Sequence, residues 1–201
     1  MSLNDTLFKL ITKNDEATLT QIDLYSLVEV LDQIEANEFE TAYASGRSLI
    51  LELLIRDQYE LAHKFADKTS TLMIDEACAL GKLSVVKKII AENPKLVHYK
   101  SAVEGFYPIH LAAGFSESLE TVEYLVEQGA DVNVYSDGHK LKSIPPLIAA
   151  TLGGDKAIVE FLLKSGADLD ALEVDTERSA FDIAKKNNRF DLAEILAARE
   201  E

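Results

Sequence analysis

The chain has little cysteine and little positive charge. Cys78 is the single cysteine among 201 residues, so no disulfide can form within the chain. We expect this thiol to be buried as a small apolar group in a reducing, cytoplasmic setting. Lysine and arginine number 20 against 35 aspartates and glutamates, a formal net charge of −15. Nucleic acid backbones and anionic membranes repel such a chain, so we expect neither as its partner.

Long apolar runs are absent as well. No stretch approaches the length of a membrane-spanning helix. Residues 1–13 lack a basic start and an apolar core followed by a small-residue cleavage site, so we expect no secretory leader. Hydrophobic residues still make up 47% of the chain, which is enough to bury a core. The sequence therefore predicts a folded cytoplasmic protein.

Motifs for catalysis and metal binding are missing too. No serine lies in a G-x-S-x-G context, and no phosphate-binding G-x-x-x-x-G-K-[ST] occurs. The histidines lack the spacing of metal ligands; they are His63, His98, His110 and His139. We expect no enzyme activity, no cofactor and no metal.

One pattern does occur twice between Gly105 and Asp170. The first copy reads Tyr107-Pro108-Ile109-His110-Leu111-Ala112-Ala113, then an apolar stripe over 119–126, then Gly129-Ala130-Asp131-Val132-Asn133. The second reads Pro145-Pro146-Leu147-Ile148-Ala149-Ala150, then a stripe over 157–163, then Gly166-Ala167-Asp168-Leu169-Asp170. Proline suits the first turn of a helix because its missing N–H would be unpaired there, so we expect helices from Pro108 and Pro146. Glycine favours a left-handed turn after a helix, which we expect at Gly129 and Gly166.

This pattern resembles the ankyrin repeat, whose usual form is T-P-L-H-x-A-A, a second helix and G-A-D-V-N on a period of about 33 residues. The resemblance implies an all-α helical solenoid of stacked ankyrin-type helix-turn-helix repeats with short β-hairpin fingers. It also implies that His110 hydrogen-bonds between the turn and the helix. Ile148 replaces that histidine in the next copy, so we expect its turn to be held differently. One helical pair cannot cover its apolar stripe alone, so the repeats must stack.

Fainter copies flank the two clear ones. Three matching phrases are predicted to start second helices, each with its first residue as the N-cap: Asn37-Glu38-Phe39-Glu40-Thr41-Ala42, Asp57-Gln58-Tyr59-Glu60-Leu61-Ala62 and Asn188-Arg189-Phe190-Asp191-Leu192-Ala193. Counting back from the start of each second helix by a constant spacing predicts the turn that opens each repeat. These turn positions are Gly46, Ser70, Gly105, Ser143 and Glu177. The short first interval leaves no room for a hairpin finger in the N-terminal third. Two further amphipathic helices are expected over residues 3–11 and 22–36.

We therefore expect one ankyrin-repeat array over residues 1–201. Residues 1–69 would hold degenerate repeats and a cap, residues 70–170 the well-matched repeats, and residues 171–201 a C-terminal capping repeat. A polar outer face on this last repeat is what a cap requires.

The family binds partners at variable positions beside the turn and at the end of the first helix, on its concave face. The matching positions chosen here are Val103, Phe106, Phe115, Leu141, Ile144, Leu152 and Arg178. Most are apolar, and exposed apolar residues mark interaction sites. Two interpretations stay open: a patch that contacts a partner, with Phe106 and Phe115 as its best candidates, or side chains packed against their own finger.

The resemblance implies a non-catalytic protein–protein interaction module or scaffold. We expect a monomer that binds a basic or mixed protein partner through the concave face. A dedicated inhibitor or immunity protein of one enzyme is the first alternative, and a cognate neighbour whose activity falls on mixing would favour it. A small-ligand-binding protein is the second, and a ligand-dependent melting shift without a protein partner would favour that.

Overall fold

The computed structural model describes residues 43–44, 47–55, 57–69, 71–101, 105–116, 118–137 and 143–197. The helices expected over 3–11 and 22–36, and the phrase at 37–42, lie outside these residues. The chain divides into two compact units, with the boundary between Glu76 and Ala77. The prediction that residues 1–201 form one array, with its subdivision at 69 and 170, stays a prediction.

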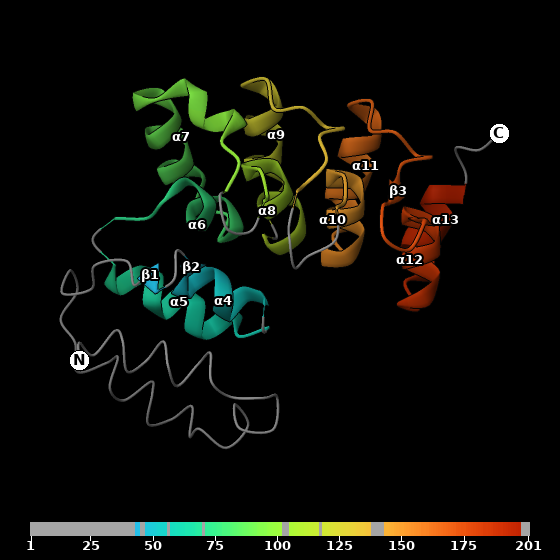
Figure 1. Ribbon diagram of the computed structural model, residues 1–201, viewed down its shortest axis with the longest axis horizontal. Coiled ribbons are helices and arrows are strands. Elements are labelled where there is room, and N and C mark those ends of the chain that lie inside the picture. Colours follow the sequence, from blue (N-terminus) through green and yellow to red (C-terminus); the bar gives the residue numbers. More distant parts are fainter. Residues whose placement is uncertain are drawn as a thin grey trace, which may run out of the picture. The chain divides into compact units, whose positions relative to one another are not determined.

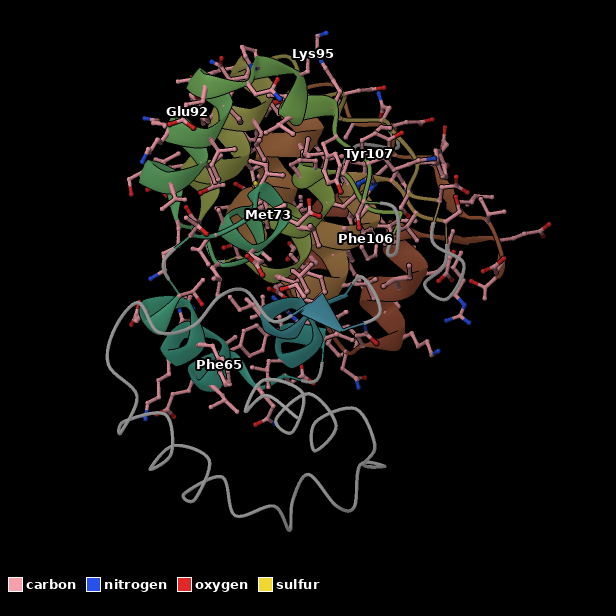
Figure 2. The ribbon with its side chains drawn as sticks, turned by 60° about the vertical axis from the view of Figure 1, so that its left-hand side comes forward. Phe65, Met73, Glu92, Lys95, Phe106 and Tyr107 are labelled. Carbon is pink, nitrogen blue, oxygen red and sulfur yellow. The ribbon has the colours of Figure 1, made fainter. Side chains whose placement is uncertain are left out.

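The first unit contains one small hairpin and packed helices. Its elements are β1 (Tyr43–Ala44), β2 (Arg47–Ser48), α4 (Leu49–Ile55), α5 (Tyr59–Lys68) and the start of α6 (Ile74–Ala79), which crosses the boundary. Helix α4 packs on α5, and Phe65, labelled in Figure 2, is buried on α5. Strands β1 and β2 pair antiparallel, so the prediction that the N-terminal third has no room for a hairpin is wrong. Strands of two residues each need far less chain than a full finger.

The second unit is a stack of helical pairs. Its elements after α6 are α7 (Leu83–Glu92), the 3-10 helix η1 (Pro94–His98), α8 (Pro108–Phe115), α9 (Leu119–Glu127), α10 (Pro146–Gly153), α11 (Lys156–Lys164), β3 (Leu172–Glu173), β4 (Arg178–Ser179), α12 (Ala180–Lys186) and α13 (Phe190–Ala197). Helices α8, α10 and α12 form an inner row, and α7, α9, α11 and α13 form an outer row (Figure 1). Strands β3 and β4 make an antiparallel hairpin. The predicted helical solenoid with short hairpin fingers is thereby confirmed.

The ends of these helices follow the local chemistry of the sequence. Helices α8 and α10 begin at Pro108 and Pro146, as predicted. The carboxylate of Asp155 caps α11 by accepting hydrogen bonds from the backbone N–H groups of the second and third residues that follow it, at 2.8 and 3.1 Å. Gly129 and Gly166 have φ angles of 94° and 90°, which confirms the left-handed turns expected after α9 and α11.

The turns between paired helices differ from the prediction. Asp57 and Asn188 were expected to cap the following helices, but they adopt φ angles of 59° and 57°. Gly154 has the same left-handed conformation, with φ 85°, at the matching turn between α10 and α11. Aspartate and asparagine are the non-glycine residues that best tolerate this region. The N-cap prediction is therefore wrong at both positions. Second helices do start within both stretches, as predicted, but they begin two residues after Asp57 and Asn188, at Tyr59 and Phe190.

Small residues allow α8 and α10 to approach closely. Ala112 and Ala150 have no exposed surface. A Cβ atom added to Gly153 would lie 2.5 Å from the carbonyl oxygen of Gly114, so the backbones touch at the ends of the two helices. A larger side chain at Gly153 cannot fit without moving one helix.

Hydrogen bonds also join successive repeats along the finger side. The backbone N–H of Asp137 donates to the carbonyl of Gly105 at 2.9 Å, and Val174 donates to Ser143 in the same way at 3.1 Å. The side chain of Asn133 donates to the carbonyl of Gly166 at 3.0 Å and accepts from a backbone N–H of the same turn. These repeated contacts fix the repeats from Gly105 onward against one another.

Candidate protein-binding surface

The possible metal ligands among the described residues are His, Cys, Asp and Glu side chains. No group of three or more His, Cys, Asp or Glu residues there could hold a metal ion. Cys78 is buried, as expected, while His63 and His98 are exposed on separate elements; His139 lies outside the described residues. None of the described helices combines the length and apolar character that a membrane span requires.

His110 has a structural role inside the stack. Its Nδ1 accepts a hydrogen bond from the backbone N–H of Tyr107 at 3.3 Å, which is the turn-to-helix bond that the resemblance implied. Since Nδ1 is the acceptor, Nε2 carries the proton and donates to the carbonyl of Ile144 in the next repeat at 2.9 Å. Burial lowers the pKa of this imidazole to about 4, although its bonds to carbonyl groups favour the charged form.

Glu76 is a buried carboxylate in the first unit. It has no exposed surface, accepts a hydrogen bond from the backbone N–H of Met73 at 2.8 Å, and accepts another from the hydroxyl of Ser48. Burial raises its pKa, and the two hydrogen bonds oppose that shift. The hydroxyl of Ser48 also accepts from the N–H of Leu51 at the start of α4, so within the first unit Glu76 is joined through Ser48 to the end of β2 and the start of α4.

Two of the predicted contact residues are buried. Phe106 and Ile144 are each 6% exposed, so the expectation that they face outward is wrong for both. Phe106 lies beside Tyr107 before α8 (Figure 2), and its ring centroid is 5.8 Å from that of His110. For these two residues the alternative interpretation, internal packing, holds.

Hydrogen bonds at the base of the fingers explain this burial. The carbonyl of Ile144 accepts from the backbone N–H of Ser136 at 3.0 Å and from its hydroxyl at 3.2 Å, in addition to His110. The carbonyl of Phe106 accepts from the backbone N–H of Ser101 at 2.9 Å in the same arrangement. A residue whose carbonyl is held in this way at the base of a finger turns its side chain into the repeat. The position of the residue relative to the repeat turn does not by itself reveal that burial.

The remaining predicted contact residues differ in exposure. Leu152 is 52% exposed near the end of α10, and Phe115 is half-buried at the end of α8. Arg178 is half-buried in β4, opposite Glu173 in the hairpin. Val103 and Leu141 lie outside the described residues.

Phe190 is an apolar residue that the sequence analysis did not place at the surface. It is 67% exposed at the first position of α13. The sequence did contain an indication of this exposure. Lys156 holds the matching first position of α11, and a lysine at that position indicates that it faces solvent. The neighbouring Arg189 donates from Nη2 to the carbonyl of Gly154 at 2.6 Å, which joins the α12–α13 turn to the α10–α11 turn.

We predict that Phe106→Ala lowers the free energy of unfolding by about 3 kcal/mol or more, because it empties a buried site. Phe190→Ala is the matched control and should change stability by less than about 0.5 kcal/mol, since that ring is exposed. Urea unfolding followed by circular dichroism measures both. Equal stability of the two variants would show that Phe106 is not part of the core.

We predict that His110→Gln flattens the acid side of the stability profile. The folded-state pKa of about 4 lies below the ordinary value of 6.5, so the unfolded chain binds the proton more readily. Stability from neutral His110 is therefore complete above pH 6.5 and is lost as the pH falls toward about 4, a total of about 3 kcal/mol. Glutamine keeps an N–H donor for Ile144 but does not titrate.

Urea unfolding at a series of pH values across this window tests the prediction. The exposed His98 supplies the control, and His98→Gln should follow the wild-type profile. An unchanged pH dependence in His110→Gln would contradict the role of the buried imidazole.

Comparisons with known proteins agree with this architecture. The ankyrin repeat family matches residues 104–137 and 145–173. Ankyrin repeat and SAM domain-containing protein 6 of Rattus norvegicus is 35% identical over 127 residues, which cover 62% of this chain and 14% of that protein. Ankyrin repeat protein nuc-2 of Neurospora crassa is 29% identical over 105 residues, covering 52% of this chain and 9% of the relative.

A third relative is transient receptor potential cation channel subfamily A member 1 of Drosophila melanogaster. It is 28% identical over 130 residues, which cover 63% of this chain and 10% of that protein. The chain thus spans a small fraction of the relatives it matches. Ankyrin repeats are generally protein–protein interaction modules, and the family is typically non-enzymatic. The landmarks of the sequence, the stacked helical pairs and these matches together show that residues 104–137 and 145–173 are ankyrin repeats.

Proposed function

We propose that the chain binds a protein partner on the concave face of its repeats, at a surface formed by Phe115, Leu152 and Lys186. The exposure of Leu152 carries the proposal. All residues of α10 before it, from Pro146 to Thr151, are buried, whereas Leu152 is 52% exposed. An apolar side chain held in water on a well-packed helix supports a role in contact with another molecule.

The three residues belong to successive inner helices. Phe115 follows Gly114 and Leu152 precedes Gly153, so the two apolar side chains flank the backbone contact between those glycines. Lys186 ends α12 two residues before the left-handed Asn188, as Leu152 lies two residues before the left-handed Gly154. Neighbouring parallel helices therefore bring these positions to within about one interaxial distance, roughly 8–10 Å.

The stack favours binding because it is ordered before the partner arrives. Repeat-to-repeat hydrogen bonds and the α8–α10 contact fix the backbone beneath Leu152. A partner that docks on such a surface orders few new groups, so a small number of apolar contacts can supply the affinity. Phe106 and Ile144 contribute indirectly by filling the finger bases. Arg178, Val103 and Leu141 stay proposed contacts.

A photo-crosslinking residue in place of Leu152 tests this proposal. We predict that p-benzoylphenylalanine at this position forms an adduct with a discrete protein in extracts of the source cell. The partner is then identified by mass spectrometry, purified and titrated against the chain. Leu152→Ala should weaken its binding by about tenfold, the effect of losing a moderate contact residue.

Gln128 provides the control position, because it is exposed after α9 on the outer row. The same crosslinker there should give no adduct with that partner, and Gln128→Ala should leave the affinity unchanged. Identical adducts from both positions, or full affinity in Leu152→Ala, would contradict the proposed surface.

A further inference from the structure

The last two helical pairs carry a pattern of exposed apolar and basic side chains at the turns between helices. Leu152 and Phe190 are 52% and 67% exposed. Lys156 and Lys186 are exposed at the start of α11 and the end of α12. These four residues are called the turn patch below.

The repeat fixes how the four residues lie. Leu152 and Lys186 hold the same position on neighbouring inner helices, and Lys156 and Phe190 hold the first position on neighbouring outer helices. The hydrogen bond from Arg189 to the carbonyl of Gly154 joins the two turns between them. Each apolar side chain of the turn patch therefore has a lysine at the matching position of the adjacent repeat.

Asp155 and Asp191, which adjoin the turn patch in sequence, have partners within the fold. The carboxylate of Asp155 accepts the first N–H bonds of α11. Asp191 accepts from Arg189 Nε at 3.1 Å and from its Nη2 at 3.0 Å. These two carboxylates are therefore engaged within the fold.

The two lysines are much less engaged. The Nζ of Lys156 lies 3.9 Å from an oxygen of Glu160, and the side chains are 58% and 40% exposed. An ion pair of this length and exposure contributes little to stability. No ion pair or hydrogen bond joins the side chain of Lys186 to another residue in the part of the chain that the structure describes. The turn patch thus presents positive charge beside its apolar side chains, although the whole chain carries −15.

Building on the proposed function, we propose that the turn patch binds an acidic amphipathic segment of the partner protein. Apolar side chains of that segment pack on Leu152 and Phe190, and its carboxylates pair with Lys156 and Lys186. This chemistry differs from the basic partner that the net charge suggested. Screening of charge by salt decides whether the turn patch attracts the basic or the acidic partner. At physiological ionic strength charges act over about 8 Å, so a docked segment interacts with the adjacent lysines and not with remote carboxylates.

A phage-displayed library of random peptides, selected on the immobilised full chain, supplies the probe. We expect the enriched peptides to combine aspartate or glutamate with large apolar residues. The synthesised peptides are then titrated by fluorescence anisotropy against wild type, Lys156→Glu/Lys186→Glu and Leu152→Ala/Phe190→Ala. Both double variants should bind about tenfold more weakly or worse, because each removes one half of the complementarity.

Lys88→Glu/Lys164→Glu is the matched control. Both residues are exposed lysines on outer helices, so the control changes the net charge by the same amount at other places. It should bind the acidic peptides within about twofold of wild type, if local charge decides the affinity. Thermal melts of all variants verify that each folds.

The outcomes separate this inference from the proposed function. Enrichment of basic peptides, or an equal loss in Lys156→Glu/Lys186→Glu and in the control, would overturn the acidic partner while leaving a Leu152-dependent partner intact. Peptides that bind both double variants as tightly as wild type would also overturn the acidic partner, as would a selection that enriches no peptide at all. Failure of crosslinking at Leu152 with continued binding of acidic peptides would instead remove the proposed partner surface and keep the peptide chemistry.

Discussion

The close contact between α8 and α10 is the constraint on which the second unit depends. Each helical pair has an apolar stripe that only a neighbouring pair can cover, and here the neighbours meet through alanine and glycine. Buried Ala112 and Ala150, and the approach of Gly153 to the carbonyl of Gly114, leave no space for larger side chains. Because the backbones touch, the phase of one repeat determines the phase of the next. The bond from His110 to Ile144 and the finger-to-finger bonds add polar contacts in that same phase.

This regularity turns a repeated fold into a specific surface. The same helix-end position holds Gly114, Leu152 and Lys186 in successive repeats, so one place in the fold presents different chemistry along the stack. Net charge alone would assign a basic partner to a chain of −15. The local arrangement of Lys156, Lys186 and the already paired carboxylates supports an acidic one at the turn patch. Long-range charge then affects solubility and encounter, while contact chemistry determines what stays bound.

The sequence predicted those features that depend on a residue and its immediate neighbours. Helices begin at Pro108 and Pro146 because proline fits the first turn, and left-handed turns occur at Gly129 and Gly166 because glycine allows positive φ. Burial of Phe106 and Ile144 could not be predicted in that way. It depends on hydrogen bonds such as that between His110 and Ile144, which join distant parts of the chain. The exposure of Leu152 followed correctly from repeat phase, whereas Phe190 was missed because only first-helix and turn positions were considered as contacts.

Replacement of Gly153 by alanine tests the central contact most directly. Gly114→Ala is the comparison, since a Cβ there would meet its nearest atom, the carbonyl oxygen of Ala149, at 3.4 Å instead of 2.5 Å. Urea unfolding should show Gly153→Ala less stable by about 1–3 kcal/mol, the cost of overpacking. Gly114→Ala should be unchanged or more stable by up to about 1 kcal/mol, because it gains the benefit of replacing a helical glycine without the clash. A gain of about 0.4–1 kcal/mol in Gly153→Ala, the ordinary benefit of replacing a helical glycine, would show that α8 and α10 do not touch as described.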